Sequence, residues 1–355
     1  MVFVAVSCPG FFSLPVLAQI DEPVFTEHQQ IAEAALTEGV VIVRTTTDKV
    51  EVADLLERFR SLYPGVMIQY FKMNSTELYN EFLSEAASGV GTADILWSSS
   101  MDLQIKLVND GYAMRYVSPE ASSLPPWAVW RNEAYGVTAE PVAFVYNRRR
   151  LPETRVPRTH ESLLSALVTN PNAWQGRVAA YDPERSGTGF LFLTQDVQVT
   201  PRTWELVRSM GQVGVKLYTS TATMLDQVAS GDVLLAYNIL GSYALERAKI
   251  DSQIGVVLPS DYMLVLSRIA FIPRTARHPN AARLFLDYLL SKDGQLQLAA
   301  RSLPPVRTDT GSTIGFAGSS AAPRPIQVSP ELLTYLDQSK RASFLKQWRR
   351  IIQGR

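Results

Sequence analysis

Short runs of β-branched residues alternate with segments of helical periodicity along most of this chain. The run from Val40 to Val43 is followed by a segment, 52–62, whose apolar residues fall on one helical face. Runs at 66–70 and 93–97 are each followed by another helical segment. Strand–helix–strand alternation of this kind predicts an α/β fold in which helices flank a central, mostly parallel sheet.

The alternation starts again after an extended segment from Val142 to Tyr146. With 355 residues, the chain is long enough for two domains. Further strands are expected at 177–181, 215–218, 233–237, 254–257, 262–266 and 269–272. Helices are expected at 278–300 and 330–352, with a Gly-, Ser- and Pro-rich surface linker at 311–325. The sequence therefore predicts two α/β lobes joined by extended segments.

These joining segments place a ligand cleft between the lobes. We expect a first lobe at 39–140 plus 259–322, a second lobe at 146–254 plus 323–355, and interlobe hinge strands at 141–145 and 255–258. Sites in such sheets lie at the carboxyl ends of the strands, where helix N-termini present N–H groups. The loops that follow the strands are thus the places to search for ligand contacts.

Four of five strand-end loops are dense in hydroxyl groups. Hydroxyls and helix N-termini together favour an anion, so we predict a cleft for an anionic or polyhydroxylated ligand. Ser and Thr at any one helix start are usually simple N-caps, so the prediction depends on the recurrence of such loops in both lobes. Arg44 and Arg185 could supply charge or form surface ion pairs. The candidate ligand-binding residues are Thr45, Thr46, Thr47, Ser98, Ser99, Arg185, Ser186, Gly187, Thr188, Thr219, Tyr237 and Asn238.

Composition excludes several classes of protein. Lys plus Arg and Asp plus Glu balance at 34 each, without the basic excess of a nucleic-acid binder. The first 20 residues carry no charge, and residues 1–18 resemble a secretory signal peptide. The single cysteine, Cys8, lies inside this leader, where lipid acylation is the alternative role. We expect a soluble mature protein without disulfides, metal or cofactor.

A hydrolytic enzyme is the alternative of another class. The three histidines, His28, His160 and His278, are widely separated, and none is near a strand-end serine. Nucleophile-elbow, zinc-protease, phosphate-loop and dinucleotide-binding motifs are absent from the sequence. Glu133 and Glu140 are the remaining candidate acid–base pair. The sequence therefore favours a protein that binds its ligand without turning it over.

Four segments resemble extracellular solute-binding proteins of ABC importers, in the iron(III)- and phosphorylated-solute-binding group. They are 39–43, 93–99, 141–147 and 280–295, and the closing segment 340–348 is similar to the group's C-terminal helix. The resemblance covers 39–352. It implies the two-lobed periplasmic binding protein (type II) fold, with hinge closure on a small solute, delivery to an inner-membrane ABC permease, and a monomer in the periplasm.

The resemblance leaves the solute open. Ferric members of the group carry adjacent tyrosines where this sequence has Gly241 and Ser242, and neither residue offers an anionic oxygen. We therefore expect a sugar phosphate, a phosphoglycerate-type compound or a phosphonate. A ferric-binding protein that uses Tyr237 with a bridging anion is one alternative. A ligand-sensing protein that feeds a membrane two-component sensor is the other.

Overall fold

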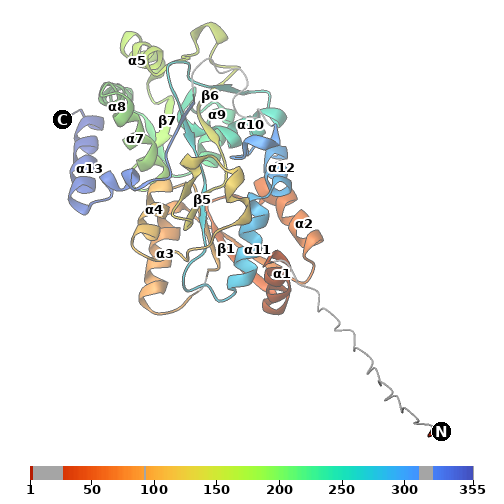
Figure 1. Ribbon diagram of the computed structural model, residues 1–355. Helices are drawn as coiled ribbons and strands as arrows, with labels where there is room; N and C mark the ends of the chain where they lie inside the picture. Colours follow the sequence, from red (N-terminus) through yellow and green to blue (C-terminus); the bar gives the residue numbers. More distant parts are fainter. Residues whose placement is uncertain (3–26, 92, 312–322, 355) are drawn as a thin grey trace.

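A computed structural model describes residues 1–2, 27–91, 93–311 and 323–354. The predicted signal peptide, 1–18, lies outside the described residues except for its first two positions, and so does most of the predicted linker. Two sheets, each flanked by helices, lie one above the other (Figure 1). This arrangement confirms the predicted two-lobed α/β class.

The first sheet has six strands. In spatial order they are β2 (Met67–Lys72), β1 (Val40–Thr45), β3 (Ile95–Ser98), β12 (Ile269–Phe271), β5 (Ala134–Gly136) and β4 (Val129–Trp130). Its helices are α1 (Glu27–Glu38), α2 (Ala53–Leu62), α3 (Ser75–Ala87), α4 (Met101–Asn109), α11 (Pro279–Leu290) and α12 (Lys292–Ala300). The expected helix at 278–300 is thus two helices, because Ser291 ends the first and N-caps the second.

The second sheet has seven strands. They are β13 (Pro323–Pro325), β11 (Met263–Leu266), β6 (Glu140–Asn147), β9 (Leu235–Leu240), β7 (Val178–Tyr181) and β8 (Lys216–Tyr218), with β10 (Ile254–Val257) also paired to β6. Its helices are α5 (His160–Thr169), α6 (Pro171–Trp174), α7 (Gly187–Val199), α8 (Thr203–Gln212), α9 (Thr221–Ser230), α10 (Gly241–Ile250) and α13 (Gln338–Ile352).

Both sheets are mixed rather than mostly parallel. The pairs β1–β2, β1–β3, β7–β8 and β7–β9 are parallel, as the alternation predicts. The strands that carry the chain between lobes, β6 and β12, run antiparallel to their neighbours. A chain that leaves one sheet and later returns to it enters in the opposite direction, which produces the antiparallel pairs.

The chain crosses between the sheets at two described places. It leaves β5 and enters β6 through residues 137–139, and it returns from β11 to β12 through residues 267–268. The segments expected to be hinge strands, 141–145 and 255–258, lie respectively within β6 and over the end of β10, so both belong largely to the second sheet. Residues 323–325 of the expected linker form β13, parallel to β11.

The expected C-terminal helix is divided in two. A 3-10 turn, η6 (Pro330–Tyr335), precedes α13, and the Asp337 carboxylate accepts hydrogen bonds from the backbone N–H groups of Ser339 and Lys340 to cap that helix. Phe344 and Trp348 anchor α13 in the core of the second lobe. Among the described residues, every helix is too short or too polar to span a bilayer.

Candidate functional site: the cleft between the lobes

A cleft lies where the carboxyl ends of β1, β2 and β3 face those of β7, β8 and β9. Its lining is Thr46, Asp48, Lys72, Met73, Asn74, Ser75, Ser99, Tyr181, Ser186, Thr188, Thr219, Ser220, Thr221, Ala222, Leu240 and Tyr243. The enclosed space is about 60 Å³, against roughly 300–1,000 Å³ for a typical small-molecule site. The lobes are therefore drawn together in this structure.

Five helices begin at this cleft. The lining includes residues in or next to the first turns of α3, α4, α7, α9 and α10. Asn74, Ser186 and Ser220 N-cap three of these helices through their side chains. The N-terminus of each helix carries partial positive charge from the aligned peptide dipoles. Their convergence makes the cleft attractive to an anion although few of its side chains are charged.

Hydroxyl groups join the two lobes across the cleft. Ser99 Oγ of the first lobe lies 2.9 Å from Thr188 Oγ1 of the second, and Thr46 Oγ1 lies 3.2 Å from Ser99 Oγ. The Tyr243 hydroxyl donates to Asp48 Oδ2 at 3.0 Å and accepts from the Asp48 backbone N–H at 3.0 Å. These groups are able to exchange their mutual hydrogen bonds for bonds to a ligand's oxygens.

A buried ion pair lies beside the cleft, next to the lining residue Tyr243. Arg268 and Glu140, both fully buried, form hydrogen bonds of 2.7 and 3.0 Å. Arg268 also donates to Thr47 Oγ1 at 2.8 Å, and its guanidinium lies 5.3 Å from the centre of the Tyr243 ring. Thr138 and Ser242 donate to the Glu140 carboxylate. Because both described chain crossings contribute to it, this network connects the two lobes where the chain passes between the sheets.

The structure brings five of the sequence-derived candidates into the cleft lining: Thr46, Ser99, Ser186, Thr188 and Thr219. Gly187 lies beside them, in close contact with the first lobe; a Cβ there would meet Ser100 Oγ at 2.4 Å. These five lining residues and Gly187 form the core of the candidate site.

Four other candidates lie outside the lining. Three of them, Thr45, Thr47 and Ser98, are buried beneath it. The Thr47 N–H donates to Thr45 Oγ1, and the Ser100 N–H donates to Ser98 Oγ. Thr47 Oγ1 accepts a hydrogen bond from the Arg268 guanidinium. Arg185 is exposed, and its carbonyl accepts from Thr76 Oγ1 at 3.4 Å. The first three shape the loops that carry the lining.

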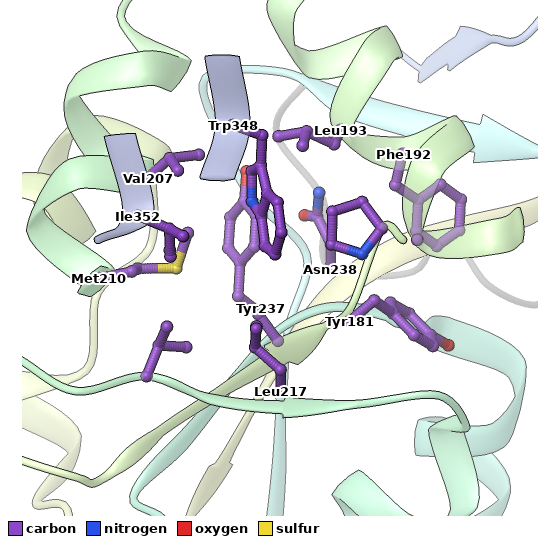
Figure 2. A pocket seen from close by; sticks show the side chains of 14 residues that line it. Tyr181, Phe192, Leu193, Val207, Met210, Leu217, Tyr237, Asn238, Trp348 and Ile352 are labelled. Atoms are coloured by element: carbon purple, nitrogen blue, oxygen red, sulfur yellow. The ribbon is translucent and has the colours of Figure 1, made fainter. Parts of the chain in front are cut away.

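Tyr237 and Asn238 lie in the interior of the second lobe instead. Figure 2 shows both among apolar side chains of α7, α8 and α13, including Trp348. The Tyr237 hydroxyl donates to Asp196 Oδ2 at 2.7 Å, and the Asn238 amide donates to the same oxygen. Asn238 has a left-handed backbone (φ 52°), opposite a register shift between β6 and β9. These two side chains therefore support the lobe rather than line the cleft.

Eleven lining residues were not among the sequence-derived candidates, and Asp48, Lys72, Tyr181 and Tyr243 are four of them. Lys72 ends β2, and the loop after that strand occupies the same position in its unit as the loops that were searched. Asp48 ends the first hydroxyl-rich loop, and Tyr181 precedes the loop that contains Ser186 and Thr188. Strand-end position alone would have found Lys72 and Tyr181.

The side chains proposed for catalysis do not converge. Glu140 is locked in its ion pair with Arg268, whereas Glu133 lies half-buried between β4 and β5. His160 and His278 pair with Asp261 and Asp94, respectively. Among the described residues, no group of three or more His, Cys, Asp or Glu side chains is placed to hold a metal ion.

The positions that correspond to the ferric tyrosine pair contribute no metal ligand. Gly241 begins α10, and Ser242 is buried with its hydroxyl on Glu140. Burial raises the pKa of the Tyr181 and Tyr243 phenols above the ordinary value.

Two α/β lobes that meet across a cleft at the carboxyl ends of their strands define the periplasmic binding protein class. Comparison with known proteins confirms this. Residues 54–321 match the family model for bacterial extracellular solute-binding proteins, and the chain belongs to that family. The predicted resemblance to solute-binding proteins is thereby confirmed.

Solved structures agree over nearly the whole chain. The substrate-binding protein of an ABC transporter from Agrobacterium tumefaciens is 36% identical, covers 90% of this chain and 97% of its own, and has a TM-score of 0.82. AfuA from Actinobacillus pleuropneumoniae, solved with fructose-6-phosphate, is 19% identical over 89% of this chain and 99% of its own, with a TM-score of 0.70. The second likeness concerns the fold alone.

A curated relative is similar in sequence. The phosphoglycerate transport regulatory protein PgtC of Salmonella typhimurium is 25% identical over 262 residues, which are 73% of this chain. The match spans 64% of the relative's length.

Proposed function

We propose that this chain is the solute-binding component of an ABC importer, and that it captures a small anionic solute in the interlobe cleft by hinge closure in the periplasm. The observation that carries the proposal is the convergence of five helix N-termini on a hydroxyl-lined cleft. An anion gains from each helix dipole and from each hydroxyl that donates to it. The 36% identical relative, a substrate-binding protein of an ABC transporter, supports the transport role.

The solute class follows from the same contacts. Phosphate and phosphonate groups offer three oxygens to surrounding donors, which suits hydroxyls and N–H groups arriving from both lobes. The curated relative, a phosphoglycerate transport regulatory protein, supports this class. We place the hinge at residues 137–139 and 267–268, where the chain crosses between sheets. The protein acts without catalysis, as a monomer that docks on a membrane permease.

The test is isothermal titration of the protein with 3-phosphoglycerate. Thr188→Val removes a hydroxyl from the cleft at nearly constant volume. Because a hydrogen bond to a charged group is worth about 1.5–3 kcal/mol, affinity should fall roughly tenfold or more.

Thr194→Val is the matched control. Thr194 lies on the same helix, and its buried hydroxyl bonds the Leu191 carbonyl away from the cleft. Its affinity should equal that of the wild type. Absence of binding of any phosphorylated or phosphonate compound, or equal losses in both variants, would refute the proposal.

A sensor component is the second candidate function, because the curated relative is named a regulatory protein. Deleting the gene separates the two roles. Loss of solute uptake supports the importer component, whereas intact uptake with loss of the transcriptional response to the solute supports the sensor.

A further inference from the structure

A surface groove lies between α8 and α13 of the second lobe and shares no lining residue with the interlobe cleft. Its volume is about 550 Å³. Figure 1 shows the two helices together at one outer side of that lobe. Three of the seven lining residues are cations, Arg208, Lys346 and Arg350, and none is a carboxylate. The groove is therefore a basic site that solute capture does not use.

The charges of the three groove cations are open to a partner. All three residues are exposed, and none belongs to an ion pair among the described residues. A cation in the last turn of a helix stabilises the helix dipole, which accounts for Arg350. Arg208 and Lys346 lie before the last turns of α8 and α13, respectively, so the dipole does not explain them.

The carboxylates nearest to α8 and α13 have cations of their own. Glu161 and Glu205 share Arg202, and Glu184 pairs with Arg349. These pairs lie outside the groove lining. They leave the three groove cations without a neutralising partner.

The two remaining cations of α13 also lie outside the groove lining. Lys340 interacts with the capping carboxylate of Asp337. The Arg341 guanidinium lies 4.1 Å from the centre of the Phe190 ring and interacts with the buried carboxyl group of Asp102. With these partners and those of the ion pairs counted, the face contains seven cations and five carboxyl groups. The excess positive charge is concentrated at the groove.

The groove suits an extended anionic surface. A single small anion is best held by buried donors in fixed positions, whereas these cations are exposed and their side chains have long, flexible stems. Trp204, half-buried in the groove, packs on Phe344 with 5.1 Å between ring centres, and tryptophan is common at membrane–water interfaces. Phe344 and Trp348 hold the apolar face of α13 in the core. Contact with a membrane is therefore limited to the lipid headgroups.

We propose that this groove binds the surface of an anionic phospholipid bilayer. The lipid phosphates lie against Arg208, Lys346 and Arg350, and the second lobe rests on the headgroups without inserting. Each Lys or Arg near such a surface strengthens binding about fivefold. Binding of this kind keeps the protein at the membrane in which its permease lies. The inference goes beyond the proposed function and does not depend on the identity of the solute.

The experiment is co-sedimentation of the full chain with two kinds of vesicle, phosphatidylcholine alone and an equal mixture of phosphatidylcholine and phosphatidylglycerol. The chain should bind the mixed vesicles only. Binding should be lost in about 1 M NaCl, where the screening length is about 3 Å. Arg208→Gln, Lys346→Gln and Arg350→Gln together should lower the partition coefficient roughly 100-fold, about fivefold for each cation.

The matched control removes three exposed cations from other places. Arg60→Gln changes α2, and Arg131→Gln and Arg149→Gln change the loops after β4 and β6. This variant should bind the mixed vesicles as the wild type does. Circular dichroism and titration with 3-phosphoglycerate should give wild-type results for both triple variants, which separates a loss of membrane binding from a loss of folding or of solute capture.

Four results would overturn the inference. They are equal losses of vesicle binding in both triple variants, equal binding to both kinds of vesicle, no binding to the mixed vesicles at low salt, and binding to polyglutamate in place of vesicles. The last result would assign the groove to an acidic protein segment. None of them bears on the proposed function, which the titration with 3-phosphoglycerate tests separately.

Discussion

Gly187 should control how far the lobes can close. It begins α7 of the second lobe and faces α3 and α4 of the first. A Cβ at this position would lie 2.4 Å from Ser100 Oγ, 2.9 Å from Leu103 Cδ1 and 3.0 Å from Ser75 Oγ. All three neighbours belong to the opposite lobe. Gly187→Ala should therefore raise the free energy of the closed conformation and leave that of an open conformation unchanged.

The size of the effect follows from the overlap. Inserting a methyl group into a well-packed contact costs about 1–3 kcal/mol, and each 1.4 kcal/mol is tenfold in a dissociation constant. If closure accompanies binding, the affinity for 3-phosphoglycerate should fall by about 5- to 150-fold. Alanine is a good helix former, so the second lobe should fold as well as before.

Calorimetric titration measures the affinity, and small-angle X-ray scattering with and without the solute measures closure. Ser100→Ala is the control, because Ser100 Oγ has no hydrogen-bond partner among the described residues and its loss should leave binding unchanged. Combined with Gly187→Ala, it removes the shortest contact and should restore part of the affinity. Wild-type affinity and full compaction in Gly187→Ala alone would refute the reasoning.

Two further predictions concern stability. Arg268→Ala leaves Glu140 buried without its cation and should lower the free energy of unfolding by about 3–5 kcal/mol in urea; a loss below about 1 kcal/mol would contradict this role for the pair. Burial raises the pKa of Asp102 to about 7 from an ordinary 3.8, so between these values the native state binds more protons than the unfolded chain. The contribution of Asp102 to the free energy of unfolding is therefore greatest below about pH 4. It declines as the pH rises to about 7, by up to about 4 kcal/mol. Asp102→Asn should flatten that decline in unfolding curves taken from pH 4 to 8, and an unchanged decline would argue against it.

The alternation of strands and helices was predictable because it depends on local patterns. Runs such as Val40 to Val43 are apolar and β-branched, and the structure places β1 there. The direction of the strands was harder to predict from the sequence. The antiparallel course of β6 and β12 follows from where the chain crosses between lobes, and no local pattern records that crossing.

The cleft hydroxyls were predictable from strand-end position, as Ser99 and Thr188 illustrate. The direction in which the Tyr237 and Asn238 side chains point could not be predicted in this way. Their direction depends on the left-handed backbone at Asn238 and on Asp196, which is 42 residues away in the sequence. The pair of Glu140 with Arg268 joins residues 128 apart. Tertiary partners of this kind leave no periodic signal.

The central claim is that the cleft binds a small phosphorylated or phosphonylated anion. A thermal-shift screen of the full chain tests it most directly, with sugar phosphates, phosphoglycerates, phosphonates, inorganic phosphate, dicarboxylates and chelated ferric iron. A ligand at about 100 times its dissociation constant stabilises the native state by about 2.7 kcal/mol. The account predicts a shift with phosphorylated or phosphonate compounds and none with iron. A shift with iron alone, or with none of these compounds, would contradict it.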